Sequence, residues 1–219
     1  MGKQVSLITF TGKLGNMIGY MHNGKPCLRS IPDTVGRAEG SRHASDRLGT
    51  ASTNAALIRK TIYGPLDIQP DGRHVNRLTT LLIPSGGSNM SRIIGFRFNK
   101  QTGTDRFFTQ PPKLSEDNIL HIPAQKLRAP RYITSLEVKV IATRINFTTR
   151  KADGVESALL VIDARVPFNG AAVSVDIPGE DILVITLQVR GMKNNIPSEN
   201  RKYLAADIVA VQTSQALES

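Results

Sequence analysis

Five short runs rich in β-branched residues constrain the fold of this 219-residue chain more than any other feature. They cover residues 133–147, 157–163, 171–177, 181–190 and 203–213. Dipeptides that favour turns lie between them: Asp153-Gly154, Asn169-Gly170, Pro178-Gly179 and Asn194-Asn195. Short strands at this spacing are typical of an antiparallel sandwich or barrel. We therefore predict that residues 91–219 form a β-sandwich-like body.

The first 90 residues have a different pattern. Asn23-Gly24 lies between two apolar segments, 17–21 and 26–30, and this dipeptide favours a two-residue hairpin turn because both residues accept a positive φ. An amphipathic helix is predicted over residues 42–62, because apolar residues recur there every three or four positions. These residues are Ala44, Leu48, Ala51, Ala55, Ile58 and Ile62.

Four further local predictions complete the pattern. We expect a short strand at Val5–Phe10, a glycine-rich break at Gly12–Asn16, a second helix over residues 74–82, and a hairpin formed by residues 92–98 and 106–108. The predicted fold class is therefore mainly β with a helical N-terminal region (α+β). Residues 1–90 would form a basic N-terminal arm, made of a β-hairpin and two helices, ahead of the β-body.

The positive charge is distributed unevenly. The formal net charge is +10, and residues 1–60 carry nine Lys or Arg against three Asp or Glu. Residues 61–130 carry nine against five, whereas residues 131–219 carry ten of each. The excess therefore lies in the first 130 residues, which predicts an anionic partner for that part of the chain.

Residue patterns that support catalysis are missing from the sequence. The four histidines are not at metal-ligand spacing, and no G-x-x-x-x-G-K-[ST] phosphate loop occurs. Asp176, Glu180 and Asp181 surround a turn, and they fit a solvated tip, a calcium site or an acidic docking face. Cys27 is the single cysteine and cannot form an intramolecular disulfide. We expect a protein that is not an enzyme and has no cofactor or metal.

The candidate partner-binding residues are basic side chains of the predicted hairpin and first helix. Three readings of them stay open: a solvated face, contact with an acidic subunit surface, or binding of nucleic acid. The candidates are Lys13, Lys25, Arg29, Arg42, Arg47, Arg59 and Lys60.

About the first 50 residues resemble a group of uncharacterised bacterial proteins, and the resemblance implies a bacterial or phage context. The matching elements are Gly12-Lys13-Leu14-Gly15-Asn16-Met17-Ile18-Gly19-Tyr20, Asn23-Gly24-Lys25 and Arg29-Ser30-Ile31-Pro32. The chain lacks the Trp that often precedes the turn glycine in that group. The family has no established activity, so the resemblance implies a hairpin, a helix and a later β-domain without a mechanism.

These observations lead to one functional expectation and one alternative. We expect a structural, self-assembling subunit of a filament, tube or particle, which docks on neighbouring copies through its N-terminal arm. The alternative is a nucleic-acid-binding protein that uses the basic N-terminal half. No apolar run approaches the roughly 20 residues of a membrane span, and the N-terminus lacks a signal-peptide pattern. We therefore expect a cytoplasmic protein, or one that forms part of a released particle.

Overall fold

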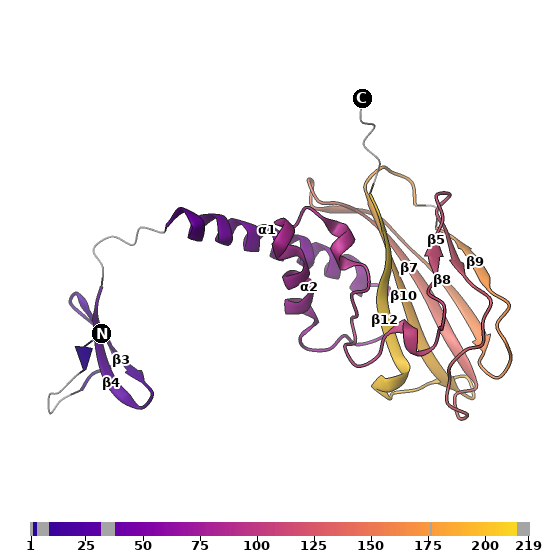
Figure 1. Ribbon diagram of the computed structural model, residues 1–219, viewed down its shortest axis with the longest axis horizontal. Helices are drawn as coiled ribbons and strands as arrows, with labels where there is room; N and C mark the ends of the chain where they lie inside the picture. Colours follow the sequence, from indigo (N-terminus) through magenta and orange to yellow (C-terminus); the bar gives the residue numbers. More distant parts are fainter. Residues whose placement is uncertain (1, 4–8, 32–37, 176, 214–219) are drawn as a thin grey trace. The chain divides into compact units, whose positions relative to one another are not determined.

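The computed structural model describes residues 2–3, 9–31, 38–175 and 177–213. It divides into two compact units, Met1–His43 and Ala44–Ser219. The predicted fold class is confirmed, because three β-sheets dominate and the two α-helices precede the five-stranded and three-stranded sheets in the chain (Figure 1).

The first unit contains a four-stranded antiparallel sheet in the order β1-β4-β3-β2, called here the N-terminal sheet. Its strands are β1 (Gly2–Lys3), β2 (Gly12–Leu14), β3 (Met17–His22) and β4 (Lys25–Ser30). The predicted hairpin turn is confirmed, since Asn23 and Gly24 have φ values of 49° and 74°. The predicted break at Gly12–Asn16 is wrong in part, because β2 pairs with β3 there. Of the strand predicted at Val5–Phe10, residues 5–8 lie outside the described residues, and residues 9–10 are not in a strand.

The second unit has three layers: helices, a five-stranded sheet and a three-stranded sheet. The helical layer contains most of α1 (Glu39–Tyr63), all of α2 (His74–Leu82) and the short 3₁₀ helices η1 (Ile83–Ser85) and η2 (Met90–Ile93). In the five-stranded sheet, β10 (Ile182–Lys193) pairs with β7 on one side and with β12 and β11 on the other, and β8 pairs with the far side of β7. These neighbours are β7 (Ser135–Asn146), β8 (Lys151–Asp163), β11 (Ile196–Pro197) and β12 (Leu204–Gln212).

The three-stranded sheet has the order β5-β6-β9. Its strands are β5 (Lys113–Leu114), β6 (Ile119–Ile122) and β9 (Ala171–Ser174), and two more 3₁₀ helices are η3 (Thr104–Arg106) and η4 (Arg201–Tyr203). All strand pairs of the five-stranded and three-stranded sheets are antiparallel. The strands predicted from the five β-rich runs are therefore present as β7, β8, β9, β10 and β12.

Two hydrophobic clusters lie on opposite faces of the five-stranded sheet. Leu136 and Val138 of β7 belong to the cluster shared with the three-stranded sheet. Val184 of β10 and Ile208 of β12 pack with Ile58 and other residues of the helices. Because both faces are covered, β7 and β10 are buried at nearly every position. This explains why their sequences read as continuous apolar runs instead of strict alternation.

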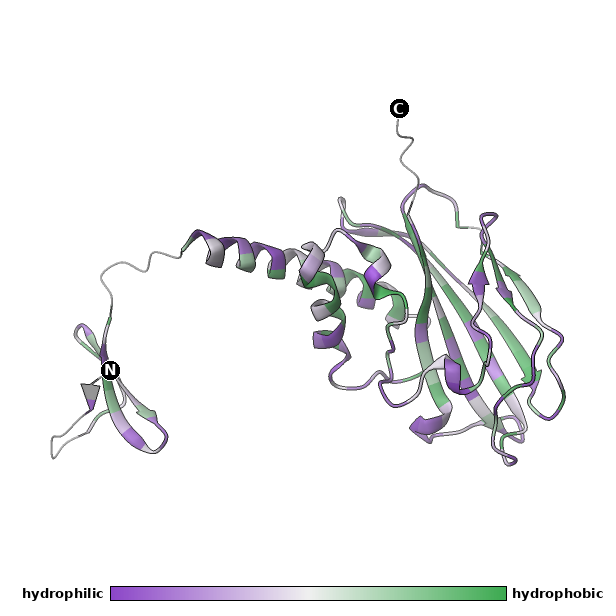
Figure 2. Ribbon diagram, viewed as in Figure 1, coloured by the Kyte–Doolittle hydropathy of each residue, from purple (hydrophilic) through white to green (hydrophobic). Residues whose placement is uncertain are grey.

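The boundary between the units falls at residues 43–44, and not at residue 90 as we expected. Residues 39–50 of α1 are all exposed, and burial starts at Ala51. Many residues of this exposed half of the helix are hydrophilic (Figure 2). The remainder of the apolar stripe, from Ala51 to Ile62, is buried against the sheet. The helices thus belong to the body because a sheet face rich in apolar residues requires a cover.

Two local predictions were wrong. The hairpin predicted at residues 92–98 and 106–108 is absent, because Gly95–Phe98 instead hydrogen-bonds along the edge of β12. Gly95 N donates to Ile208 O over 2.8 Å, and Phe98 N donates to Ala206 O over 2.8 Å. Asp153-Gly154 is not a turn but part of β8, where the register with β7 shifts opposite Arg144 and Ile145.

Candidate functional site

The seven predicted partner-binding residues are divided between the two units. Lys13, Lys25 and Arg29 lie in strands of the N-terminal sheet, and all three are exposed. Arg42 lies in the exposed first half of α1, and Lys60 is exposed near its end. These five retain accessible charges.

The other two predicted residues have main-chain partners within the second unit. Arg47 donates from Nη2 to Pro84 O over 3.1 Å, and Arg59 donates from Nε to Ala55 O over 3.2 Å. Arg47 therefore links α1 to η1, the 3₁₀ helix that follows α2.

One face of the N-terminal sheet is basic. The register pairs Ile18 with Lys13 on one side and with Arg29 on the other, so these side chains share a face. The same alternation adds Lys25, which pairs with His22, and Lys3, which pairs with Cys27. The Arg29 guanidinium lies 5.9 Å from the centre of the Tyr20 ring, a cation–π contact on this face.

The opposite face of the same sheet is apolar. Leu14 pairs with Met17, and Met21 lies further along β3 on the same side. Their exposed fractions are 59%, 40% and 56%, respectively. Gly19 lies between the two methionines, and a Cβ there would be 2.9 Å from the Phe10 ring, so glycine permits the Phe10 segment to approach.

The N-terminal sheet buries little of its own surface. Among the described residues before His43, only Gly19 and Cys27 are buried. Domains of fewer than roughly 40 residues usually need disulfides, metals or association to fold, and Cys27 is a free thiol. The exposed apolar face of this small sheet is therefore a candidate interaction surface.

The outer strand of the five-stranded sheet also carries exposed apolar residues. In the part of the chain that the structure describes, β8 pairs with β7 on one side and with no strand on the other. Val155, Leu159 and Val161 point to one side of β8 and are 43%, 58% and 63% exposed. They lie on the face that the helices cover elsewhere, but the helix-side cluster contains no β8 residue. Long apolar edge strands of this kind tend to pair with another chain.

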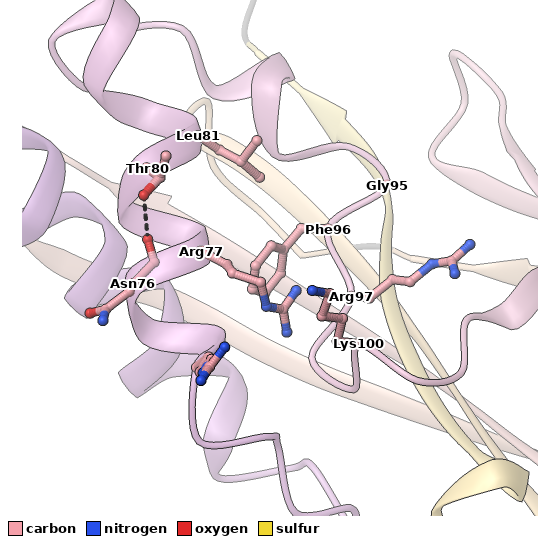
Figure 3. A pocket seen from close by; sticks show the side chains of 9 residues that line it. Asn76, Arg77, Thr80, Leu81, Gly95, Phe96, Arg97 and Lys100 are labelled. Carbon is pink, nitrogen blue, oxygen red and sulfur yellow. Dashed lines mark hydrogen bonds between the residues drawn. The ribbon is translucent and has the colours of Figure 1, made fainter.

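A pocket of about 540 Å³ opens between α2 and the segment Gly95–Lys100 (Figure 3). We call it the cationic pocket, because four of its lining residues are basic. The lining consists of Arg73, Asn76, Arg77, Thr80, Leu81, Gly95, Phe96, Arg97 and Lys100. The prediction from sequence missed it, although residues 61–130 have an excess of positive charge.

Asp71 links two residues of the pocket lining, Arg77 and Lys100. Its carboxylate accepts hydrogen bonds from Arg77 Nη2 at 2.5 Å and from the main-chain N of Lys100 at 2.8 Å. Burial opposes the ionisation of Asp71, but these bonds, a bond from the main-chain N of Arg73 and the Arg77 charge outweigh it, so its pKa is lowered. Arg77 also stacks over Phe96 at 5.2 Å from the ring centre.

A buried carboxylate lies near Arg97, one of the residues that line the pocket. Asp207 of β12 accepts hydrogen bonds through Oδ2 from Thr104 N at 2.7 Å and Thr104 Oγ1 at 3.0 Å. Its Oδ1 is buried without a hydrogen-bond partner among the described residues. The nearest cation is Arg97, whose Nε is 3.9 Å away and whose guanidinium pairs with Asp105 at 2.9 Å. Burial raises the pKa of Asp207 to about 6, despite the Thr104 hydrogen bonds.

The predicted acidic tip is only partly within the described residues, because Asp176 lies outside them. Asp181 is close to Asp153 of β8, and a hydrogen bond and repulsion between the two carboxyl groups raise the pKa of Asp181. No group of three or more His, Cys, Asp or Glu in the described ranges could hold a metal ion.

None of the helices described is both long and apolar enough to span a membrane. A scan of protein-family models, a search of curated proteins and a search of solved structures found no match to the chain.

Proposed function

We propose that the protein is a structural subunit that self-associates, and that its N-terminal sheet docks on a neighbouring copy. One observation carries the proposal: the sheet has an exposed apolar face formed by Leu14, Met17 and Met21, yet only two of its unit's described residues are buried. Covering these side chains supplies hydrophobic free energy that the unit lacks by itself. The proposal assigns the chain no catalytic role.

The receiving surface that we propose is the open edge of β8 on the next copy. Its exposed row, Val155, Leu159 and Val161, matches the apolar face in character, and its main-chain groups are available to an added strand. Donor and acceptor surfaces lie on different parts of the chain. Such a contact is heterologous, so repetition builds a ring or an open polymer. A filament, tube or particle, in the cytoplasm or released from it, would follow.

The basic face of the N-terminal sheet favours a second candidate function. Lys13, Lys25 and Arg29 are exposed on the same face as Tyr20, and cations beside an aromatic ring are a common arrangement in single-strand binding. In that case the N-terminal half would bind nucleic acid with an affinity that falls steeply with salt. A single-stranded oligonucleotide titrated at low and high salt tests this candidate.

The main test compares the full chain with a truncated chain that starts at Ala44. Both hydrophobic clusters of the body begin at Ala51 or later, so the truncation removes no core residue. Light scattering after size exclusion should show a mass that rises with concentration for the full chain and a monomer for the truncated chain. Negative-stain images should show assemblies of the full chain. A full chain that stays monomeric at high concentration would refute the proposal.

A further inference from the structure

We propose that the cationic pocket binds a phosphate monoester that carries an apolar or aromatic group. The pocket belongs entirely to the second unit, since its lining residues lie between Arg73 and Lys100. The inference is therefore independent of the N-terminal sheet and of self-association.

The charges of the pocket lack a balancing set of carboxylates. Arg77 is paired with Asp71, but the side chains of Arg73 and Lys100 make no ion pair with any described residue. Arg97 lines the pocket, but its guanidinium points away from Lys100 and pairs with Asp105 (Figure 3). Two cations in the pocket thus remain free to bind an anion.

Lys100, which has no ion pair among the described residues, and Arg77, which is paired with Asp71, converge on one point (Figure 3). The Lys100 side chain is directed toward the Arg77 guanidinium (Figure 3). Of the Arg77 side-chain nitrogens, Nη2 donates to Asp71 and Nε is buried, so Nη1 is the donor left for a ligand. An oxyanion between the ammonium and the guanidinium would accept hydrogen bonds from both and would relieve their repulsion.

The number of donors favours phosphate over carboxylate. A phosphate monoester carries up to two charges and three terminal oxygens, which suits Arg77 Nη1, the ammonium of Lys100 and the guanidinium of Arg73, which also lines the pocket. A carboxylate offers one charge and two oxygens, so it would leave part of this set unused.

The remaining lining indicates that the ligand has an organic part. A volume of about 540 Å³ is within the usual range of small-molecule sites and far exceeds the space that a bare phosphate occupies. Leu81 on α2 supplies apolar surface beside the cations, and the Phe96 ring lies beneath the Arg77 guanidinium (Figure 3). An aromatic or aliphatic group attached to the phosphate would contact this surface.

Phenyl phosphate is the probe that combines the two features, and its binding to the full chain can be followed by calorimetry or NMR titration. We expect saturable binding with a Kd of about 1 mM or tighter, and weaker binding of inorganic phosphate and of benzoate. Lys100→Gln should weaken phenyl phosphate binding by at least about tenfold, because it removes a charge-assisted hydrogen bond.

Lys113→Gln is the matched control, since Lys113 is exposed in β5 and outside the pocket, and it should leave binding unchanged. Neither lysine side chain has a hydrogen-bond or ion-pair partner among the described residues, so both variants should keep the thermal midpoint of the parent. Absence of saturable phenyl phosphate binding, or equal binding by the Lys100→Gln variant, would overturn the proposal. A single-stranded oligonucleotide that binds when phenyl phosphate does not would also overturn it, in favour of a nucleic-acid site.

Discussion

Asp207 should make the stability of the body fall as the pH rises through weakly acidic values. The carboxyl group is 5% exposed, and its pKa is about 6 in the folded chain. In the unfolded chain the pKa returns to about 3.9. Between these values the folded state binds more protons than the unfolded state, so the free energy of unfolding decreases as the pH rises.

The size of the effect follows from the shift. A difference of about two pKa units corresponds to about 3 kcal/mol, reached in full above pH 7. Asp207→Asn removes the titrating group while leaving an oxygen that can accept from Thr104. The variant should gain about 3 kcal/mol of stability relative to the parent between pH 4 and pH 7.

Urea unfolding followed by circular dichroism, at several pH values from 4 to 8, measures this difference. Glu116→Gln is the control, because Glu116 is an exposed carboxyl group that is not among the groups shifting the pKa of Asp207, and it should retain the pH dependence of the parent. If the Asp207→Asn variant showed the same pH slope as the parent, the assignment of a buried, poorly compensated carboxylate would be wrong.

Two further predictions concern packing, and urea unfolding of the variants measures both. Ile58→Ala should cost about 2–5 kcal/mol because Ile58 is fully buried, whereas Leu48→Ala, on the same helix stripe but 49% exposed, should cost less than about 1 kcal/mol. Gly154→Ala should cost about 1–3 kcal/mol, since its Cβ would lie 2.4 Å from Ile177 Cγ2. Gly49→Ala, with open space around it on an exposed helix, should stabilise by about 0.5–1 kcal/mol.

The strands of the body could be predicted because their signals are local. The run at 133–147 became β7 (Ser135–Asn146), and Asn194-Asn195 forms a turn with two positive φ values, 52° and 64°. Asp153-Gly154 misled the prediction because the turn dipeptide lies at a bulge inside β8. A local pattern cannot distinguish a bulge from a turn, since both place small or polar residues in a break of the alternation.

Long-range pairing explains the other differences. Residues 92–98 have a strand-like pattern, but their partner is the edge of β12, more than 100 residues further along the chain. The placement of the helices also depends on long-range contacts. The apolar stripe predicted α1 correctly, but the position of α1 on the β-body is set by the sheet face that it covers.

The candidate surfaces were predictable in part. Charge counting identified Lys13, Lys25 and Arg29, but their common face became evident only from the strand register. The apolar face opposite them depends on the same register. The cationic pocket combines α2 with a segment that lies about 20 residues later, so no motif in the sequence could indicate it.

The most direct test of self-association compares variants of the two faces of the N-terminal sheet. Met17→Gln with Met21→Gln changes the apolar face, and Lys13→Gln with Lys25→Gln changes the basic face. Measured by light scattering over a range of concentrations, the parent and the basic-face variant should exceed the monomer mass of 23.9 kDa, and the apolar-face variant should not. A parent that remains at the monomer mass, or an apolar-face variant that associates as the parent does, would contradict the proposal.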